Sequence, residues 1–211
     1  TSVTGVQTCA LPICIGTEDD GSRGSGSLGA TRGGRMYPVF RLALEFWRFR
    51  KAAPLGLLDT HVSRHICWPW DLDPWRELNN GRTLTIYDLG RLPLGMRTGL
   101  HRVLKAQGWG LTVAGNTVRY RRRVRMFDRV TIHSRCIGWD RRFFYIEQSL
   151  WRLGECTSHQ VVRSAITSPA GIVAPTQVVQ ALGHVGPSPD LPDWIAGWIT
   201  AEDRRPWPPT V

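Results

Sequence analysis

The spacing of apolar residues predicts one long helix in the first half of the chain. Between residues 84 and 107, apolar side chains recur at three- and four-residue intervals, which is the period of an amphipathic helix. Pro93 falls inside this pattern, so we expect a kink or a break there, and Gly108 suits the end of the helix. Asn79 and Asn80 come just before the pattern, and we expect the Asn80 side chain to cap the helix.

Segments with the period of a β-strand lie on both sides of this helix. Residues 60–68 alternate, with Val62, Arg64 and Ile66 on one side. Four further segments carry β-branched and aromatic residues: 111–124, 129–138, 143–153 and 156–168. The short segments 138–142 and 154–155 are typical of hairpin turns. One buried helix followed by long antiparallel strands predicts an α+β fold.

Residues 36–51 predict a separate amphipathic helix. Its expected apolar face consists of Val39, Leu42, Ala43, Phe46 and Trp47. Its expected polar face consists of Arg41, Glu45 and Arg48. We favour a helix that packs on its own domain. The alternative is a basic, aromatic helix that lies in a membrane interface.

The two ends of the chain differ from its centre. Residues 1–13 resemble the translation of a sequencing adaptor, and residues 16–35 have a disordered composition, so we expect 1–35 to lie outside the domain and Met36 to be the natural start. We divide the rest into the helix at 36–58, a domain at 59–184 and a tail at 185–211. Short helices are expected at 175–182 and 194–201.

The balance of charges adds a partner class to this picture. The chain has 211 residues and a formal net charge of +10, and Lys51 and Lys105 are its only lysines. Basic, arginine-rich chains bind nucleic acid, anionic membranes or phosphate groups. The five cysteines have no metal-ligand spacing and the histidines are scattered, so we expect free thiols, a cytoplasmic location and no metal or other cofactor.

Candidate chemistry gathers in the loop before the long helix. Asp71 and Asp73 alternate in a segment rich in Pro and Trp, and Asn79, Asn80 and Gly81 follow. A helix N-terminus presents free N–H groups and the positive end of a dipole. A carboxylate beside it can act on a carbonyl group whose oxygen those N–H groups polarise.

These segments resemble a known family. The residues Asp71-Leu72-Asp73 and Leu78-Asn79-Asn80 are similar to the D-x-D-x-x-G-H-V-N-N pattern of hotdog-fold thioesterases of the 4-hydroxybenzoyl-CoA type. Further segments resemble a bacterial branch of acyl-CoA thioesterases related to a vertebrate thioesterase-superfamily protein: residues 79–82, 88–91, 118–122, 138–140 and 144–148. The chain departs from the pattern at Arg76 and Glu77, where the family has Gly and His, and at Thr83, where an aromatic residue is usual.

The resemblance implies a fold, a reaction and a set of site residues. The fold is a long central helix wrapped by an antiparallel sheet, and the reaction is hydrolysis of acyl-CoA to a carboxylic acid and CoA. Asp73 corresponds to the catalytic carboxylate, and the amide of Asn80 to the group that polarises the thioester carbonyl. Asn79 and Gly81 shape the same turn. Asp88 lies near the place where another hotdog branch keeps its acid, although an Asp88–Arg91 ion pair is the simpler interpretation.

A dense run of arginines between residues 119 and 125 suggests a place for the phosphates of CoA. On a continuous strand Arg121, Arg123 and Arg125 share one face, and we take Arg121 and Arg123 as candidate substrate-binding residues. A solvated strand face that prevents aggregation is the alternative.

The resemblance also bears on partners. It implies a homodimer or a dimer of dimers in which two sheets pair edge to edge and each site uses both chains. We expect acyl-CoA as substrate, contact with a membrane surface as a further alternative, and no nucleic acid, because the aromatic spacing of a single-strand platform is missing. A non-catalytic hotdog protein that binds acyl chains or acyl-CoA is the second functional hypothesis, and the changes at Arg76 and Glu77 favour it.

Overall fold

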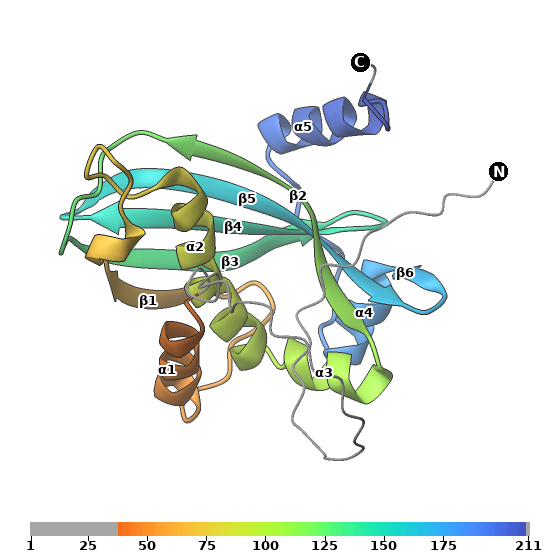
Figure 1. The fold of residues 1–211 in the computed structure, drawn as a ribbon. Helices are drawn as coiled ribbons and strands as arrows, with labels where there is room; N and C mark the ends of the chain where they lie inside the picture. Colours follow the sequence, from red (N-terminus) through yellow and green to blue (C-terminus); the bar gives the residue numbers. More distant parts are fainter. Residues whose placement is uncertain (1–37, 210–211) are drawn as a thin grey trace, which may run out of the picture.

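The structure is a computed structural model that describes residues 38–209 (Figure 1). Its elements follow along the chain as α1 (Val39–Phe49), β1 (His61–Ile66), the 3-10 helix η1 (Pro69–Asp71), α2 (Asn80–Arg97), α3 (Leu100–Gln107), β2 (Gly110–Tyr120), β3 (Arg129–Trp139), β4 (Phe144–Arg152), β5 (Glu155–Ser168), β6 (Gly171–Val173), α4 (Pro175–Ala181) and α5 (Asp193–Arg204). The expectations for residues 1–35 and for a start at Met36 lie outside the described residues.

All the strands belong to one antiparallel sheet. Its order is β1-β3-β4-β5-β2, and the short β6 pairs with β5 beyond that path. The hairpins at residues 138–142 and 154–155 join β3 to β4 and β4 to β5, as the sequence predicts. Figure 1 shows α2 lying across the face of this sheet. A sheet around one long helix is the arrangement that the resemblance to hotdog proteins implies.

Helix α2 packs on the sheet because its inward side is apolar and close-fitting. Ile86, Tyr87 and Leu89 are almost inaccessible to solvent. Gly90 lets the helix approach β3, since a Cβ atom there would lie 2.6 Å from Ser134 Oγ. Removal of this apolar surface from water is the main stabilisation of the fold.

The long helix departs from its prediction at Pro93. It continues through Pro93 to Arg97, and the chain turns only at Gly99, whose φ of 80° is left-handed. Of the kink or break expected at Pro93, the break is therefore wrong, whereas the helix end expected at Gly108 is confirmed as the C-cap of α3. Gly99 separates α2 from α3, because glycine adopts this conformation at little steric cost.

Strand β2 also ends earlier than the sequence predicts. The amides of Arg121 and Arg122 both donate to the carbonyl oxygen of Thr157, at 2.8 and 3.0 Å, and the regular ladder stops at Tyr120. The expectation that Arg121, Arg123 and Arg125 share one strand face is wrong, because these residues lie in the connection from β2 to β3.

Helix α1 packs on its own domain, but its covered side only partly coincides with the expected apolar face. Val39 and Trp47 are 65% and 61% exposed, whereas Glu45 is only 3% exposed. Arg41 points inward, where its guanidinium donates to Asp71 and to the carbonyl oxygen of Ile66. Of the expected apolar face, Leu42 and Phe46 are half-buried, and the other three residues are exposed.

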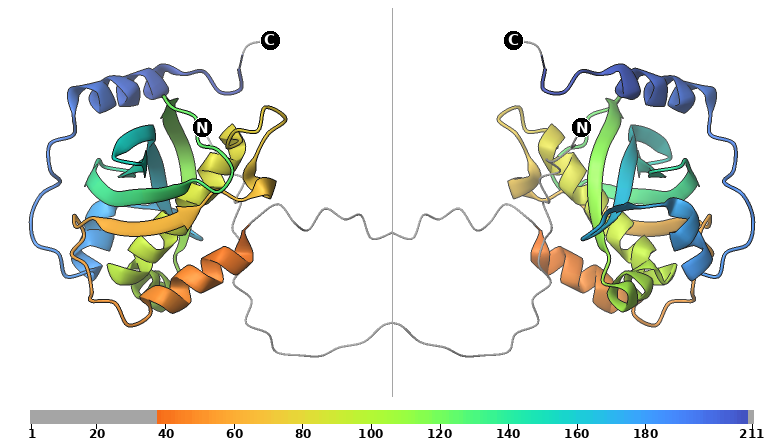
Figure 2. Two further views of the ribbon diagram at one scale, coloured as in Figure 1. Left: turned by 90° about the vertical axis from the view of Figure 1, so that its left-hand side faces the viewer. Right: turned by 90° about the vertical axis from the view of Figure 1, so that its right-hand side faces the viewer.

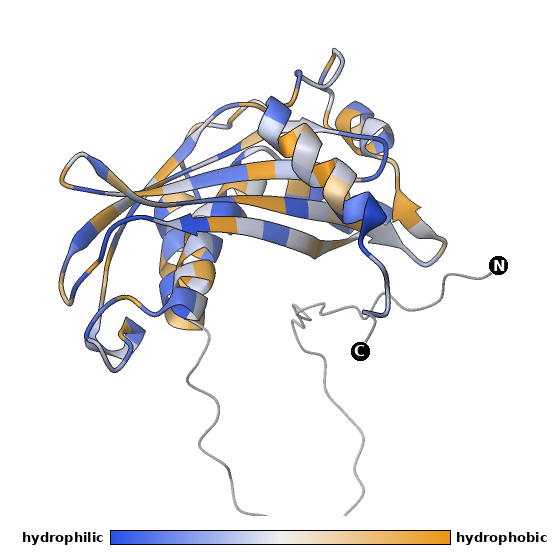
Figure 3. Cartoon of the chain, turned by 90° about the horizontal axis from the view of Figure 1, so that it is seen from above, coloured by the Kyte–Doolittle hydropathy of each residue, from blue (hydrophilic) through white to orange (hydrophobic). Residues whose placement is uncertain are grey.

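Helix α5 covers part of the other face of the sheet. Ile195 is fully buried against Phe143, Tyr145 and Val161. Figure 3 shows this helix in front of strands that carry both hydrophilic and hydrophobic residues. The helix expected at 194–201 is thus longer than predicted, and the one expected at 175–182 is α4. Figure 2 shows α1 and α5 at opposite sides of the fold.

Candidate active site

Asp71 holds the loop before α2 in place. Its side chain is inaccessible to solvent, and its two oxygens pair with Arg41 of α1 at 2.7 Å and with Arg82 of α2 at 2.8 Å. The amide of Trp68 donates to the same carboxylate at 3.0 Å. Because these bonds satisfy a buried charge from three directions, Asp71 is a structural residue that joins α1, η1 and α2.

Asp73 closes a tight loop and keeps one carboxylate oxygen open. Its Oδ1 accepts hydrogen bonds from the amides of Trp75 at 2.9 Å and Glu77 at 3.2 Å. Its Oδ2 accepts no hydrogen bond from the residues that the structure describes. The loop bonds thus use Oδ1 and leave Oδ2 open to other partners.

The start of α2 presents unpaired amides. Asn79, rather than the expected Asn80, caps the helix, since its Oδ1 accepts a hydrogen bond from the Arg82 amide at 3.0 Å. Asn80 is the first helical residue. Within residues 38–209 the amides of Asn80 and Gly81 have no backbone acceptor. Such amides can donate to an anion or to a polarised carbonyl oxygen.

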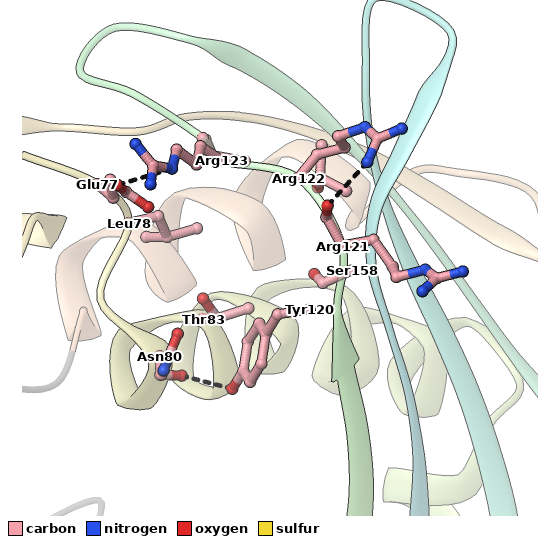
Figure 4. Close-up of a pocket in the computed structure, with 11 residues that line it drawn as sticks. Glu77, Leu78, Asn80, Thr83, Tyr120, Arg121, Arg122, Arg123 and Ser158 are labelled. Atoms are coloured by element: carbon pink, nitrogen blue, oxygen red, sulfur yellow. Dashed lines mark hydrogen bonds and ion pairs between the residues drawn. The ribbon is translucent and has the colours of Figure 1, made fainter.

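A cavity of about 190 Å³ lies between this helix start and the end of β2. Figure 4 shows Asn80, Thr83 and Tyr120 on one side of it and the arginine segment on the other. Its lining comprises Glu77, Leu78, Asn80, Thr83, residues 120–124, Thr157 and Ser158. The Tyr120 hydroxyl donates to the Asn80 carbonyl oxygen at 3.0 Å and so ties β2 to α2.

The floor of the cavity is neutral and its rim is positively charged. Ser158 shares a hydrogen bond of 2.8 Å with the hydroxyl of Tyr87, and burial raises the pKa of that tyrosine, which keeps it a neutral phenol. At the rim Arg123 pairs with Glu77 at 3.0 Å and Arg122 pairs with Glu155. Arg121 forms no ion pair with any described residue, so its charge is available to an anionic ligand.

The structure brings only some of the predicted residues together. Asn80, Arg121 and Arg123 line the cavity. Asp73, Asn79, Gly81 and Asp88 do not belong to its lining. Asp88 forms an ion pair with Arg91, which lies one turn further along α2, so the simpler interpretation of these two residues is confirmed.

Several residues of the cavity were not predicted from the sequence. Tyr120 lies inside a segment that resembles the family, beside the arginine run, and could have been included on that ground. Thr157 and Ser158 lie in a strand pattern like any other, and only the pairing of β2 with β5 brings them to the cavity. A second cavity, of about 220 Å³ on the other face of β3 and β4, contains none of the predicted residues.

Comparison with known proteins gives the family. Residues 67–199 match the model of the thioesterase-like superfamily. The chain is 31% identical over 184 residues to the protein THEM6 of Xenopus laevis, across 81% of this chain and 86% of that protein.

Solved structures agree on the fold. The YbaW probable thioesterase of Escherichia coli superposes with a TM-score of 0.55 at 16% identity, over 58% of this chain and 96% of that one. A thioesterase of Thermus thermophilus, solved with coenzyme A and Zn, superposes with a TM-score of 0.51 at 20% identity, again over 58% and 96%. The sheet, the helix that it surrounds and these matches confirm the hotdog fold, and the chain belongs to the thioesterase-like superfamily.

Proposed function

We propose that this protein hydrolyses acyl-CoA thioesters at the cavity beside the start of α2. Within the superfamily we place it with the 4-hydroxybenzoyl-CoA type, in the bacterial branch whose segments it resembles. The observation that carries the proposal is the position of the cavity, which has the Asn80 amide on one side and the Arg121 guanidinium on the other, neither of them paired with a residue of 38–209. A thioester attached to a phosphorylated carrier needs both.

Each side of the cavity has a separate task in this proposal. The amide of Asn80 donates to the thioester carbonyl oxygen, where negative charge develops as the carbonyl is attacked. Arg121 and Arg123 bind phosphate groups of CoA, which the guanidinium fork suits. The Thermus thermophilus thioesterase, which was solved with coenzyme A, supports this choice of ligand.

Asp73 supplies the carboxylate. Its open Oδ2 either attacks the thioester carbon, which forms a mixed anhydride and releases the CoA thiolate, or removes a proton from the water that attacks. In the first route water then hydrolyses the anhydride and returns the carboxylate. The Oδ1 bonds to Trp75 and Glu77 fix the side chain during either route.

The cavity of one chain is too small for the whole substrate. About 190 Å³ is below the usual range for a drug-sized ligand, roughly 300–1,000 Å³. We propose that a second copy completes each site, and that Asp88 takes part, if at all, across that interface. This arrangement explains why Asp73 and Asp88 lie outside the cavity of a single chain.

Non-catalytic binding of acyl-CoA is the alternative function. The ion pair between Glu77 and Arg123 favours it, because a substrate phosphate would have to compete with the Glu77 carboxylate for that arginine. The left-handed Arg76, where the family has Gly, lies in the same loop.

Steady-state hydrolysis of a panel of acyl-CoA esters separates the two functions. We expect Asp73→Asn to lower kcat/KM by about a hundredfold or more while the protein stays folded, because the amide oxygen can keep the loop bonds but cannot act as base or nucleophile. Asp190→Asn, at an exposed position, is the matched control. Unchanged hydrolysis in Asp73→Asn would reject the role of Asp73, and acyl-CoA binding without turnover by the wild type would favour the alternative.

We also propose a cytoplasmic location. Cys67, Cys136 and Cys156 are free thiols in the structure. Burial raises the pKa of Cys67 to about 12 and that of Cys136 to about 11, so both thiols remain protonated and unreactive at neutral pH.

A further inference from the structure

Helix α1 carries an apolar stripe that faces away from the domain. Phe40, Ala43, Leu44 and Trp47 stand at positions i, i+3, i+4 and i+7, which share one side of a helix. All four are exposed, and Phe40 is 85% exposed. A globular helix usually buries this side, so the orientation needs an explanation.

Polar contacts on the other side of α1 set the orientation. Arg41 reaches the buried carboxylate of Asp71 at 2.7 Å, and Glu45 is buried where it pairs with Arg48. The ring of Phe49 lies against His61 with centroids 4.5 Å apart. One ion pair, one hydrogen bond and one aromatic contact therefore join the inward face to the domain, and the helix cannot turn its apolar stripe inward without breaking them.

The charges that accompany the stripe are positive. Arg50 and Lys51 are exposed at the end of α1, and the Arg50 guanidinium lies 4.2 Å from the centre of the Trp47 ring. The acid of this helix, Glu45, is buried. An exposed surface of Phe, Leu and Trp edged by cations matches the boundary between the acyl chains and the headgroups of an anionic bilayer.

The size of the stripe argues against a second copy as its partner. A helix of 11 residues is only about 16 Å long, so the area that one side of it offers is much smaller than the about 800 Å² that each partner of a stable protein interface buries. No helix among the described residues has the length and apolarity needed to cross a bilayer. The contact that fits is therefore shallow and parallel to the membrane plane.

We propose that α1 docks this protein on anionic phospholipid membranes, with Phe40, Leu44 and Trp47 inserted at the level of the headgroups. Helix α1 lies at the outside of the fold in both views of Figure 2, where a flat surface can reach it. The proposal does not depend on catalysis, because none of these residues belongs to the cavity or to the Asp73 loop.

Co-sedimentation of the full chain with vesicles tests this proposal. We expect the protein to sediment with vesicles of phosphatidylcholine and phosphatidylglycerol, to sediment less with phosphatidylcholine alone, and to be released by added salt. The double variant Phe40→Ser and Trp47→Ser should partition at least about tenfold more weakly. The matched control is Leu153→Ser with Val185→Ser, which removes two apolar side chains that are even more exposed and lie elsewhere, and it should bind like the wild type.

A second variant keeps the test decisive if the first one is poorly folded. Arg50→Gln with Lys51→Gln leaves the apolar stripe intact and should reduce only the part of the binding that depends on anionic lipid. No sedimentation of the wild type with either vesicle at low salt would overturn the proposal. Full binding by the folded Phe40→Ser and Trp47→Ser variant would also overturn it. If the wild type does not bind vesicles and light scattering shows that this variant has lost a dimer, the stripe belongs to an interface with a second copy.

Discussion

Arg76 has a backbone conformation that its side chain does not favour. Its φ is 60°, in the left-handed region, at the position where the resembling thioesterases have Gly. The loop imposes this angle. The Arg76 amide donates to the Asp73 carbonyl oxygen at 3.0 Å, while Asp73 Oδ1 accepts hydrogen bonds from the amides on either side of Arg76, those of Trp75 and Glu77. The Asp73 loop therefore contains local strain that a glycine would not have.

Substitutions at Arg76 should separate this strain from the loss of charge. We expect Arg76→Gly to change the free energy of unfolding by less than about 1 kcal/mol, because relief of strain offsets the greater freedom of unfolded glycine. Arg76→Val should lower it by about 1–2 kcal/mol, because a β-branched residue fits the left-handed region poorly. Urea unfolding measures both values.

Arg129, exposed at the start of β3, provides the matched pair of controls. There Val should be at least as stable as Gly, since a strand favours β-branched residues. The same order of Val and Gly at Arg76 as at Arg129 would contradict the account of strain.

At this scale the sequence predicts which residue types gather but not how each side chain is used. The alternation of Asp71 and Asp73 marks the loop, and the structure gives the two acids different surroundings. Asp71 is buried because Arg41, 30 residues earlier, reaches it. No local pattern encodes a contact over that distance, so the sequence alone cannot show which residues hold Asp71.

At the scale of elements, periodicity shows which residues share a face and leaves open which face is covered. The period of α1 groups Phe40 with Ala43 and Leu44 as correctly as it groups Arg41 with Glu45. The covered side was decided by partners from β1 and η1, which carry buried polar groups. Strands β1 to β5, by contrast, were predicted to within a few residues, because their partners are the neighbouring strands themselves, and only the three-residue β6 was missed.

Two buried histidines under α1 make this contact sensitive to acid. Burial lowers the pKa of His61 to about 4 and that of His65 to about 3, with a further contribution from Arg97 to the first and from Arg41 to the second. His65 Nε2 lies 2.8 Å from Ser63 Oγ, and His61 Nδ1 lies 3.1 Å from an Arg97 nitrogen. Both rings are neutral in the folded protein.

Stability should therefore fall as the pH drops from 6.5 towards 4. In this window the unfolded chain takes up protons on both histidines while the folded protein does not, so acid favours unfolding. Each ring can contribute up to about 3 kcal/mol by pH 4, since one pKa unit corresponds to about 1.4 kcal/mol. Burial raises the pKa of Glu45, so its protonation in the folded state opposes part of this loss.

Urea unfolding at pH 7, 6 and 5 on wild type, His65→Gln and His101→Gln measures the effect. His65→Gln should show a shallower loss of stability with acid, and His101→Gln, at an exposed position of α3, should follow the wild type. Identical pH slopes in all three proteins would show that the buried ring does not control the acid response.

At the scale of the whole molecule, the sheet has two edge strands, β1 and β2, which differ in length and surroundings. Along β1 the Arg41 side chain of α1 reaches the Ile66 carbonyl oxygen, and α5 covers part of the face of β4 and β5. Strand β2 has β5 on one side and no strand on its other side within residues 38–209. It is 11 residues long and its side chains are mostly exposed. A long open edge of this kind is a template for pairing with another chain.

We therefore predict a homodimer, alone or as half of a dimer of dimers, that pairs two β2 strands. The cavity lies at the end of β2, so a second chain along that strand would extend its walls, which its small volume requires. The pairing is isologous, and each dimer should contain two equivalent sites.

If each site takes Asp73 from one chain and Asp88 from the other, mixing and refolding inactive Asp73→Asn and Asp88→Ala chains should restore about a quarter of wild-type activity, since half of the dimers then hold one intact site. Asp73→Asn refolded alone is the control and should stay inactive. A monomer by light scattering at micromolar concentration would remove the prediction and weaken the proposed reaction, because one chain alone provides too little of the site.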